Sequence, residues 1–465
     1  MASTDLTPKR SLGSIEIFFM VVAAAAPLAA VVGNGALGVL LGNGPGMPGA
    51  YLIAGLVLIL FAAGFVKMSP HVRGRGAFYA YIRQGLGGRA GGAAAYVALL
   101  VYLVMVVGSV AGMGFFANIF LAEAFGVDIS WKILAILCLL ITGFVGYREI
   151  SLGARLLCVL LSLEVLVLVV LVIAVFAPGS GAVTSFTSFS PATILSGNFG
   201  VAIMFAFVSF LGFESAAIYS EEAREGPRTV ARALIAAVLF ISIFYAVSMW
   251  SVVTAFGADN VTAAAGENPG TLVYRAFAAY TPAIFVTLAE ALMVTSALAA
   301  TIALHNAAAR YVFALAGEGM LPGGLGALHA QMKSPHVASL TVSIITSVIV
   351  IAFILANADP LMTVLSATFG LASLGIAILQ CATSAAVMAF VARQGRTGGM
   401  GPMDSLVALV ATLCLAAIAV LILANYAVLT GDLGLLDYAP WLIPLAAILG
   451  TAVQGGRNAP AESQG

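Results

Sequence analysis

Residues 14–41 read SIEIFFMVVAAAAPLAAVVGNGALGVLL, an apolar stretch long enough to cross a membrane as a helix but interrupted by Pro27 near its middle. Residues 196–223 read SGNFGVAIMFAFVSFLGFESAAIYSEEA and carry Ser209 and Gly212 near the centre. Unpaired backbone groups are costly in lipid, so a broken span is tolerated only where it lines a cavity. Two broken spans at corresponding places in two halves of a chain indicate a substrate site near the middle of the bilayer.

The composition restricts the chain to one class of protein. It is 62% hydrophobic and 8% charged, with a mean hydropathy of +1.11, whereas a soluble domain has about 25% charged residues. Apolar runs of about 18 residues or more recur along the chain, and each can cross the hydrocarbon core as a helix. These features predict an all-α membrane protein that crosses the bilayer many times and has no separate soluble domain.

Breaks of Gly, Pro and charge divide the chain into twelve expected transmembrane helices. Their ranges are 14–41, 47–68, 91–123, 131–148, 155–177, 196–222, 231–256, 281–313, 337–356, 361–392, 404–427 and 438–455. We expect residues 1–13 and 456–465 to be polar tails and residues 14–392 to form a transporter core. Helices 11 and 12, within 404–455, would be an appendage to that core.

The basic residues predict the orientation, because Lys and Arg favour the cytoplasmic side. If the N-terminus is inside, all of the 19 Lys and Arg residues except Lys132 and Arg275 fall on the inner side. A missing or extra span would destroy this alternation. We therefore expect a multi-pass protein of the cytoplasmic membrane of a bacterial cell, with both termini in the cytoplasm. The first span is too long for a signal peptide and is expected to stay as a membrane helix.

The positions of the two breaks suggest an inverted repeat. Residues 14–177 would form one repeat and residues 196–392 the other, with helices 1 and 6 discontinuous. Helix 1 starts inside and helix 6 starts outside, and each breaks after about 13 residues. At about 1.5 Å per residue, both breaks would lie roughly 20 Å into the membrane, facing one another across a pseudo-two-fold axis.

The first break comprises Ala25, Ala26, Pro27, Leu28 and Ala29. Pro27 removes a backbone hydrogen bond and clashes with the preceding turn, while its small neighbours leave the backbone open to a ligand. The half-helix that begins here would direct its amides and positive dipole end at an anion, and a substrate carboxylate fits. The alternative is an ordinary proline kink in a packed bundle.

The second break comprises Val208, Ser209, Phe210, Leu211 and Gly212. Carbonyl oxygens at the end of its outer half-helix would suit an ammonium group. The phenylalanines around it are suited to packing, and one of them beside an unwound segment is suited to gating the site.

Carboxylates inside membrane spans are functional candidates because burying them is expensive. Glu164 lies in span 5 with no basic residue nearby in sequence, so it suits a proton carrier, or else a permanently protonated hydrogen-bond donor. Glu214 follows the second break and would carry a proton or bond the unwound backbone of span 1. Glu16 near the cytoplasmic mouth and Glu290 in span 8 receive no role.

Na⁺ is the alternative coupling ion. The hydroxyls of Thr295, Ser296 and Thr301 in span 8 would ligate Na⁺, or would bond the carbonyls of their own helix, which is the commoner case. No cofactor or metal site is expected, since the cysteines have neither metal-site nor disulfide spacing. The motifs HExxH and GxSxG are lacking, which argues against an intramembrane enzyme; a channel or a sensor remains a third class.

Around the second break the sequence resembles the amino acid–polyamine–organocation permeases. The residues that carry this resemblance are Phe210-Leu211-Gly212-Phe213-Glu214-Ser215, followed by Glu221-Glu222-Ala223 and Gly226-Pro227-Arg228. The stretches Gly76–Tyr81 and Gly317–Pro322 are similar to the family's loop after span 2 and its end of span 8. The resemblance covers spans 1–10.

The resemblance implies the five-plus-five fold of the leucine-type transporters. It further implies that a substrate carboxylate binds amides near Ala25 to Ala29 and an amine binds carbonyls near Val208 and Leu211. Glu164 and Glu214 match positions that relatives use for proton-linked transport. One departure is that Ala-Ala-Pro-Leu replaces the family's Gly-Ser-Gly-Ile type of motif in span 1.

These observations predict a secondary transporter that imports a neutral, zwitterionic amino acid with H⁺. Polyamine or small-amine uptake is the main alternative, because the missing serine leaves room for substrates without a carboxylate, and amino acid exchange is another. We expect a monomer or a weak homodimer in the lipid bilayer, with no nucleic acid partner.

Overall fold

The computed structural model describes residues 13–72, 77–148, 154–213, 227–332, 334–394 and 399–458. Every regular element within these ranges is a helix. The α-helices are α1 (Ser14–Ala24), α2 (Pro27–Ala29), α3 (Met47–Met68), α4 (Ala77–Leu86), α5 (Gly88–Phe125), α6 (Trp131–Arg148), α7 (Ala154–Phe176), α8 (Pro191–Ile194), α9 (Phe199–Val208), α10 (Pro227–Phe256), α11 (Val261–Glu267), α12 (Leu272–Tyr280), α13 (Ala283–Gly317), α14 (His336–Leu355), α15 (Ser366–Gln394), α16 (Pro402–Ala424) and α17 (Leu442–Asn458). Three π-helical segments cover Ala30–Gly35, Gly38–Asn43 and Pro360–Leu365.

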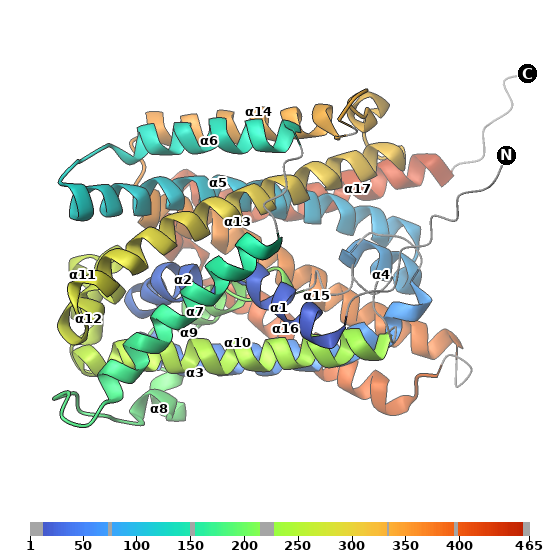
Figure 1. The fold of residues 1–465 in the computed structure, drawn as a ribbon. Coiled ribbons are helices and arrows are strands. Elements are labelled where there is room, and N and C mark those ends of the chain that lie inside the picture. The colour runs from blue at the N-terminus through green and yellow to red at the C-terminus, as the bar shows by residue number, and fades with distance from the viewer. Residues whose placement is uncertain are drawn as a thin grey trace, which may run out of the picture.

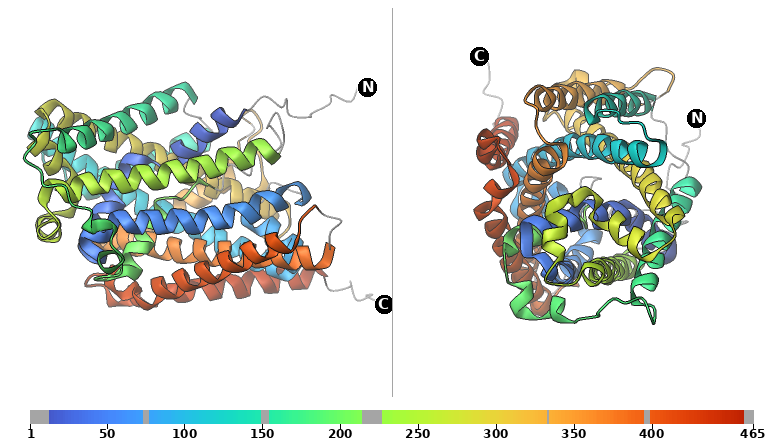
Figure 2. Two further views of the ribbon diagram at one scale, coloured as in Figure 1. Left: turned by 90° about the horizontal axis from the view of Figure 1, so that it is seen from below. Right: turned by 90° about the vertical axis from the view of Figure 1, so that its left-hand side faces the viewer.

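The long helices share one general direction, as expected for a membrane bundle (Figure 1, Figure 2). Short helices α8, α11 and α12 lie at one end, whereas α4 and the end of α17 lie at the other (Figure 1). Helices α6, α14, α16 and α17 point large apolar side chains outward, among them Leu140, Val348, Leu413 and Ile448. In a bilayer such side chains face lipid. The predicted all-α membrane fold is therefore confirmed.

Ten helices in the described ranges are long and apolar enough to cross a membrane. One of them runs from Pro27 to His71 and joins the outer half of the first expected span to the second. Within the described ranges, the sixth expected span contains the apolar helix α9, which is too short to cross a membrane by itself. The count of twelve spans stays a prediction, although α6 has the bounds expected from the sequence.

The interruption of the first span is confirmed, and in the sixth span the described residues show a helix that ends where its break was expected. Helix α1 ends at Ala24, and Ala26 adopts a left-handed conformation with φ 44° and ψ 72° before the helix resumes at Pro27. Helix α9 ends at Val208. Gly212 has φ 99°, which glycine adopts without strain because it has no Cβ atom. The resumed part of the first span and helix α9 are tied together near their ends, because the Asn198 amide donates to the Gly42 carbonyl at 2.9 Å.

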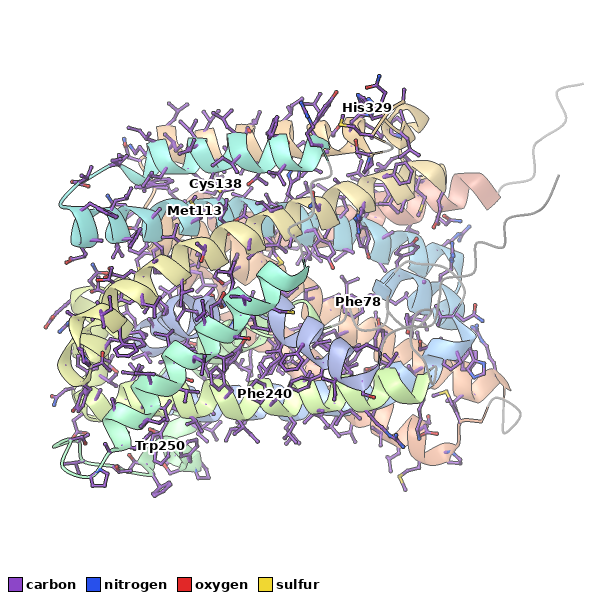
Figure 3. All side chains as sticks on the ribbon, viewed as in Figure 1. Phe78, Met113, Cys138, Phe240, Trp250 and His329 are labelled. Atoms are coloured by element: carbon purple, nitrogen blue, oxygen red, sulfur yellow. The ribbon has the colours of Figure 1, made fainter. Side chains whose placement is uncertain are left out.

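Helices α3 and α10 pack closely and support the first break. A Cβ atom on Gly55 of α3 would lie 1.7 Å from the Ser242 Oγ of α10, so only glycine fits there. Helix α1 in turn packs on α10 and α7 (Figure 1). The polar loop after α3 contains α4, whose Phe78 points into the bundle (Figure 3). These contacts fix the helices that carry the site.

Candidate substrate and ion site

Three side chains from three different helices bind the backbone of the first break. The Tyr245 hydroxyl of α10 donates to the Ala25 carbonyl at 2.8 Å, and the Tyr51 hydroxyl of α3 donates to the Ala30 carbonyl at 2.8 Å. The Leu28 amide donates to Glu164 Oε2 of α7 at 3.4 Å. The Ala25 carbonyl and the Leu28 amide, which a continuous helix would pair internally, are thus paired with side chains. This arrangement stabilises an open break at low cost in the membrane.

One backbone amide of the first break, that of Ala29, has no hydrogen-bond acceptor among the described residues. In a continuous helix the Ala29 amide would donate to the Ala25 carbonyl, but that carbonyl accepts the Tyr245 hydroxyl instead. No hydrogen bond from the Ala29 amide is found in the described part of the chain. Ala26 and Ala29 are half-buried, whereas Ala25, Pro27 and Leu28 are buried. The break therefore offers a backbone donor to an acceptor group.

The second break is a tight turn rather than an extended strand. The Phe210 amide donates to the Phe207 carbonyl and the Leu211 amide donates to the Val208 carbonyl, both at 3.1 Å. The Val208 carbonyl, which we expect to accept a hydrogen bond from the substrate's ammonium group, thus already accepts one from the backbone. A carbonyl oxygen has two lone pairs, so a second donor can still bind it. Val208, Ser209, Phe210 and Leu211 are all buried.

The structure brings the two breaks together through Ser209. Its Oγ accepts a hydrogen bond from Asn34 Nδ2 at 3.0 Å and lies 3.5 Å from the Tyr51 hydroxyl. Its own proton goes to the Phe205 carbonyl at 2.7 Å. The rings of Tyr51 and Phe210 pack on that of Tyr245, with centroids 5.3 and 5.9 Å away. The two breaks therefore form one site with an aromatic wall.

Among the described residues, Glu164 is the acid at this site. It is 5% exposed, and besides the Leu28 amide its carboxyl group bonds the Ser296 side chain of α13. Tyr245 lies close enough to interact with it electrostatically. No Lys or Arg of the described residues pairs with Glu164, so its charge has no direct counter-ion. A carboxyl group in this position is well placed to take up and release a proton.

The hydroxyls considered for Na⁺ are spread over different faces of α13. Ser296 contacts Glu164. Thr295 is exposed and donates to the Leu292 carbonyl at 3.0 Å, while buried Thr301 donates to the Ala297 carbonyl at 2.7 Å and lies beside Cys138. Two of the three thus make the local bonds of their own helix, and only Ser296 belongs to the site.

The other predicted acids are not part of this arrangement. Glu214 lies outside the described residues, and so does the Glu16 side chain. Glu290 is buried in α13 near Tyr274 of α12, not at either break. Tyr51 and Tyr245 were not among the predicted site residues, although a tyrosine hydroxyl inside an apolar span needs a hydrogen-bond partner and is a usable signal.

A second polar cluster lies at the end of the bundle where α4 meets the end of α13. The Tyr79 hydroxyl donates to Glu318 Oε1 at 2.6 Å, and Arg83 Nη1 lies 3.2 Å from Glu318 Oε2. Burial, and then the neighbouring Glu318, raise the pKa of Tyr79 above its ordinary value. The loop after span 2 is thereby fastened to the end of span 8.

Comparisons with known proteins show the family of the chain and its fold. The family model described as amino acid permease matches residues 12–450. The branched-chain amino acid permease BcaP of Lactococcus lactis subsp. cremoris is 26% identical over 313 residues, which are 62% of this chain and 64% of that relative. The chain thus matches slightly less than two thirds of the relative's length.

A solved structure shares the fold over nearly the whole chain. The crystal structure of the Eremococcus coleocola manganese transporter, in complex with an aromatic bis-isothiourea substituted compound, matches with a TM-score of 0.58 and 14% identity. The match covers 98% of this chain and 99% of that one. At this identity the likeness concerns the fold alone.

Proposed function

The chain belongs to the amino acid permease family, and on this premise we propose that it imports a neutral, zwitterionic amino acid together with H⁺ by alternating access. The expectation of a transporter rather than an enzyme is confirmed by the family. We further propose that the protein works in the cytoplasmic membrane of a bacterium with both termini inside. The observation that carries the proposal is the junction of the two breaks through Tyr51 and Ser209.

The geometry of the breaks favours an amino acid. The unpaired Ala29 amide at the start of the resumed helix suits a carboxylate, and the carbonyls of the second break suit an ammonium group. Buried Leu28, Val208, Phe210 and Leu211 favour an apolar side chain. Since the relative BcaP is named for branched-chain amino acids, leucine, isoleucine and valine are the first substrates to test.

The position of Glu164 supports the proposed proton coupling. Its carboxyl group bonds the Leu28 amide, one residue from the amide that we assign to the substrate carboxylate. Two carboxylates so close repel one another, and protonating one of them removes the repulsion. We propose that Glu164 is protonated from the outside before the amino acid binds. Opening to the cytoplasm would then release both the substrate and the proton.

The inner cluster of Tyr79, Arg83 and Glu318 suits a closing contact in this cycle. Helix α4 packs on α15 and α5 while Glu318 holds it to the end of α13. Opening the inner side would require these bonds to part. An ion pair this exposed contributes at most about 1 kcal/mol, so it can break within a transport cycle.

The test is uptake of radiolabelled amino acids into proteoliposomes with controlled gradients. We expect leucine to accumulate when the outside is acidic, with no requirement for Na⁺. Saturable leucine uptake that depends on Na⁺ and ignores the pH gradient would instead shift the coupling role to Ser296 and its neighbours. Conductance without saturation would indicate a channel.

Small-amine or polyamine uptake is the second candidate. The Ala-Ala-Pro-Leu break lacks a hydroxyl for a carboxylate, and Glu164 already provides an acid at the resumed helix. In that case Glu164 would stay charged and pair with the substrate's ammonium group. Competition of leucine uptake by putrescine and by monoamines distinguishes the two candidates, and counterflow with internal amino acids reveals an exchanger.

A further inference from the structure

The first break is held open by more than its proline. Pro27 prevents one backbone hydrogen bond and pushes against the preceding turn, which accounts for a kink. It does not require the left-handed conformation of Ala26, which costs a non-glycine residue about 1–2 kcal/mol. Some other interaction must offset that cost.

The Tyr245 hydroxyl supplies such an interaction. It donates at 2.8 Å to the Ala25 carbonyl, which would otherwise accept from the Ala29 amide. The tyrosine hydroxyl thus takes the position that the Ala29 amide would have in a continuous helix, and the left-handed Ala26 takes that amide out of line with the Ala25 carbonyl. When the hydroxyl occupies it, the Ala29 amide is left for another partner.

Tyr51 fastens the other edge of the break. Its hydroxyl donates at 2.8 Å to the Ala30 carbonyl, four residues after Ala26. Both tyrosine side chains are 0% exposed, and their rings meet edge to face. They come from α3 and α10, which pack so closely that Gly55 touches Ser242. The two edges of the break are therefore fastened to one rigid helix pair.

We propose that Tyr245 and Tyr51 are positioning residues that hold the first break open, so that the Ala29 amide stays available to the substrate carboxylate. Neither hydroxyl touches the substrate in this role. The inference rests on the proposed function in one respect only, namely that an amino acid carboxylate binds at this break. The state of the Ala29 amide itself can be tested without any substrate.

The competing explanation is that each tyrosine merely satisfies its own buried hydroxyl. Tyr426 provides the matched control, because it is 2% exposed and its hydroxyl donates at 2.8 Å to the Ala367 carbonyl, away from both breaks. Tyr426→Phe loses the same kind of bond as Tyr245→Phe.

The first experiment measures hydrogen–deuterium exchange of the full chain in detergent, without ligand. In Tyr245→Phe we expect the peptide covering residues 25–31 to take up about one deuteron less at early times, because the Ala29 amide can then bond the Ala25 carbonyl. Unchanged or faster exchange in that peptide would overturn the inference. In Tyr426→Phe the same peptide should exchange as in the wild type.

The second experiment compares leucine with isoamylamine, which has the same side chain and amine but no carboxylate. Loss of one hydrogen bond to a charged group predicts a fall in leucine affinity of about ten-fold or more for Tyr245→Phe. The affinity of Tyr245→Phe for isoamylamine should change by less than about three-fold. Tyr51→Phe should likewise lose more affinity for leucine than for isoamylamine. Equal losses for both ligands, or an equal leucine loss in Tyr426→Phe, would contradict the inference.

The two experiments separate this inference from the proposed function. If the wild type binds no amino acid but exchange slows in Tyr245→Phe, the proposed function fails and the positioning role stands. If the wild type binds leucine but neither readout moves, the positioning role fails and the proposed function stands.

Discussion

The backbone amide of Leu28 donates a hydrogen bond to the carboxyl group of Glu164, 136 residues later in the chain, at 3.4 Å. This contact joins the broken first span to the fifth span at the point where the helix resumes. It places a group that can exchange a proton beside the amides proposed for the substrate. In the proposed mechanism this half-helix end links substrate binding to protonation.

Replacing Glu164 by glutamine should abolish proton-driven accumulation. The amide keeps the size of the side chain and an oxygen for the Leu28 amide, but it cannot carry a proton. We expect leucine affinity within about three-fold of the wild type and no response of uptake to the pH gradient. Proteoliposome uptake with and without an inward acid gradient measures both.

The matched control is Glu290→Gln, because Glu290 is also a buried acid, on α13 but away from both breaks. We expect this variant to keep gradient-driven uptake. Undiminished accumulation by Glu164→Gln would remove Glu164 from the coupling mechanism.

Ser209→Ala should weaken the junction between the breaks. The Asn34 side chain would lose its acceptor and Tyr51 a neighbouring oxygen. A buried donor left unpaired costs about 1–3 kcal/mol, so we expect a lower melting temperature and weaker leucine binding. Ser162→Ala is the control, since Ser162 only bonds the Cys158 carbonyl of its own helix. Thermal unfolding with and without leucine checks both expectations. Equal melting temperatures of the two variants, with and without leucine, would contradict the role of Ser209 in joining the two breaks.

Gly55→Ala should destabilise the helix pair that supports the site. The new Cβ would lie 1.7 Å from Ser242 Oγ, and forcing the helices apart costs about 1–3 kcal/mol. Gly64→Ala on the same helix meets its nearest neighbour at 3.5 Å and should be tolerated. A partial recovery of the melting temperature in the double variant Gly55→Ala/Ser242→Gly would verify the contact; no difference between Gly55→Ala and Gly64→Ala would refute it.

The cluster of Tyr79, Arg83 and Glu318 should not be the source of pH-dependent transport. Since the folded pKa of Tyr79 is raised above its ordinary value of about 10, its hydroxyl stays protonated below that pH, and the bond to Glu318 is lost only as the pH rises well above it. We expect Tyr79→Phe to keep the pH profile of uptake between about pH 5.5 and 8.5 while altering the maximal rate. A shifted pH profile in this variant would implicate the cluster in coupling.

Part of this architecture could be predicted from the sequence. The apolar runs gave helix positions, with α6 at 131–148 as expected, and Pro27 and Gly212 marked the breaks because both residues act locally on the backbone. Glu164 was predictable as a candidate because an acid in an apolar run is costly wherever it packs.

The partners of the breaks were not predictable, because they come from residues far apart in the chain. Tyr245 bonds a carbonyl 220 residues away, and nothing near it in sequence indicates that acceptor. Likewise, local sequence could not show that Ser296 contacts Glu164 while Thr295 and Thr301 bond their own helix. Packing of α13 against α7 decides which hydroxyl faces the site.

The most direct test is leucine-driven proton movement in sealed proteoliposomes that contain a trapped pH dye. Leucine added outside a wild-type vesicle should acidify the lumen without Na⁺, and the same addition to Glu164→Gln vesicles should leave the lumen pH unchanged. Leucine uptake without acidification in the wild type, or equal acidification in Glu164→Gln, would contradict proton-coupled import through the paired breaks.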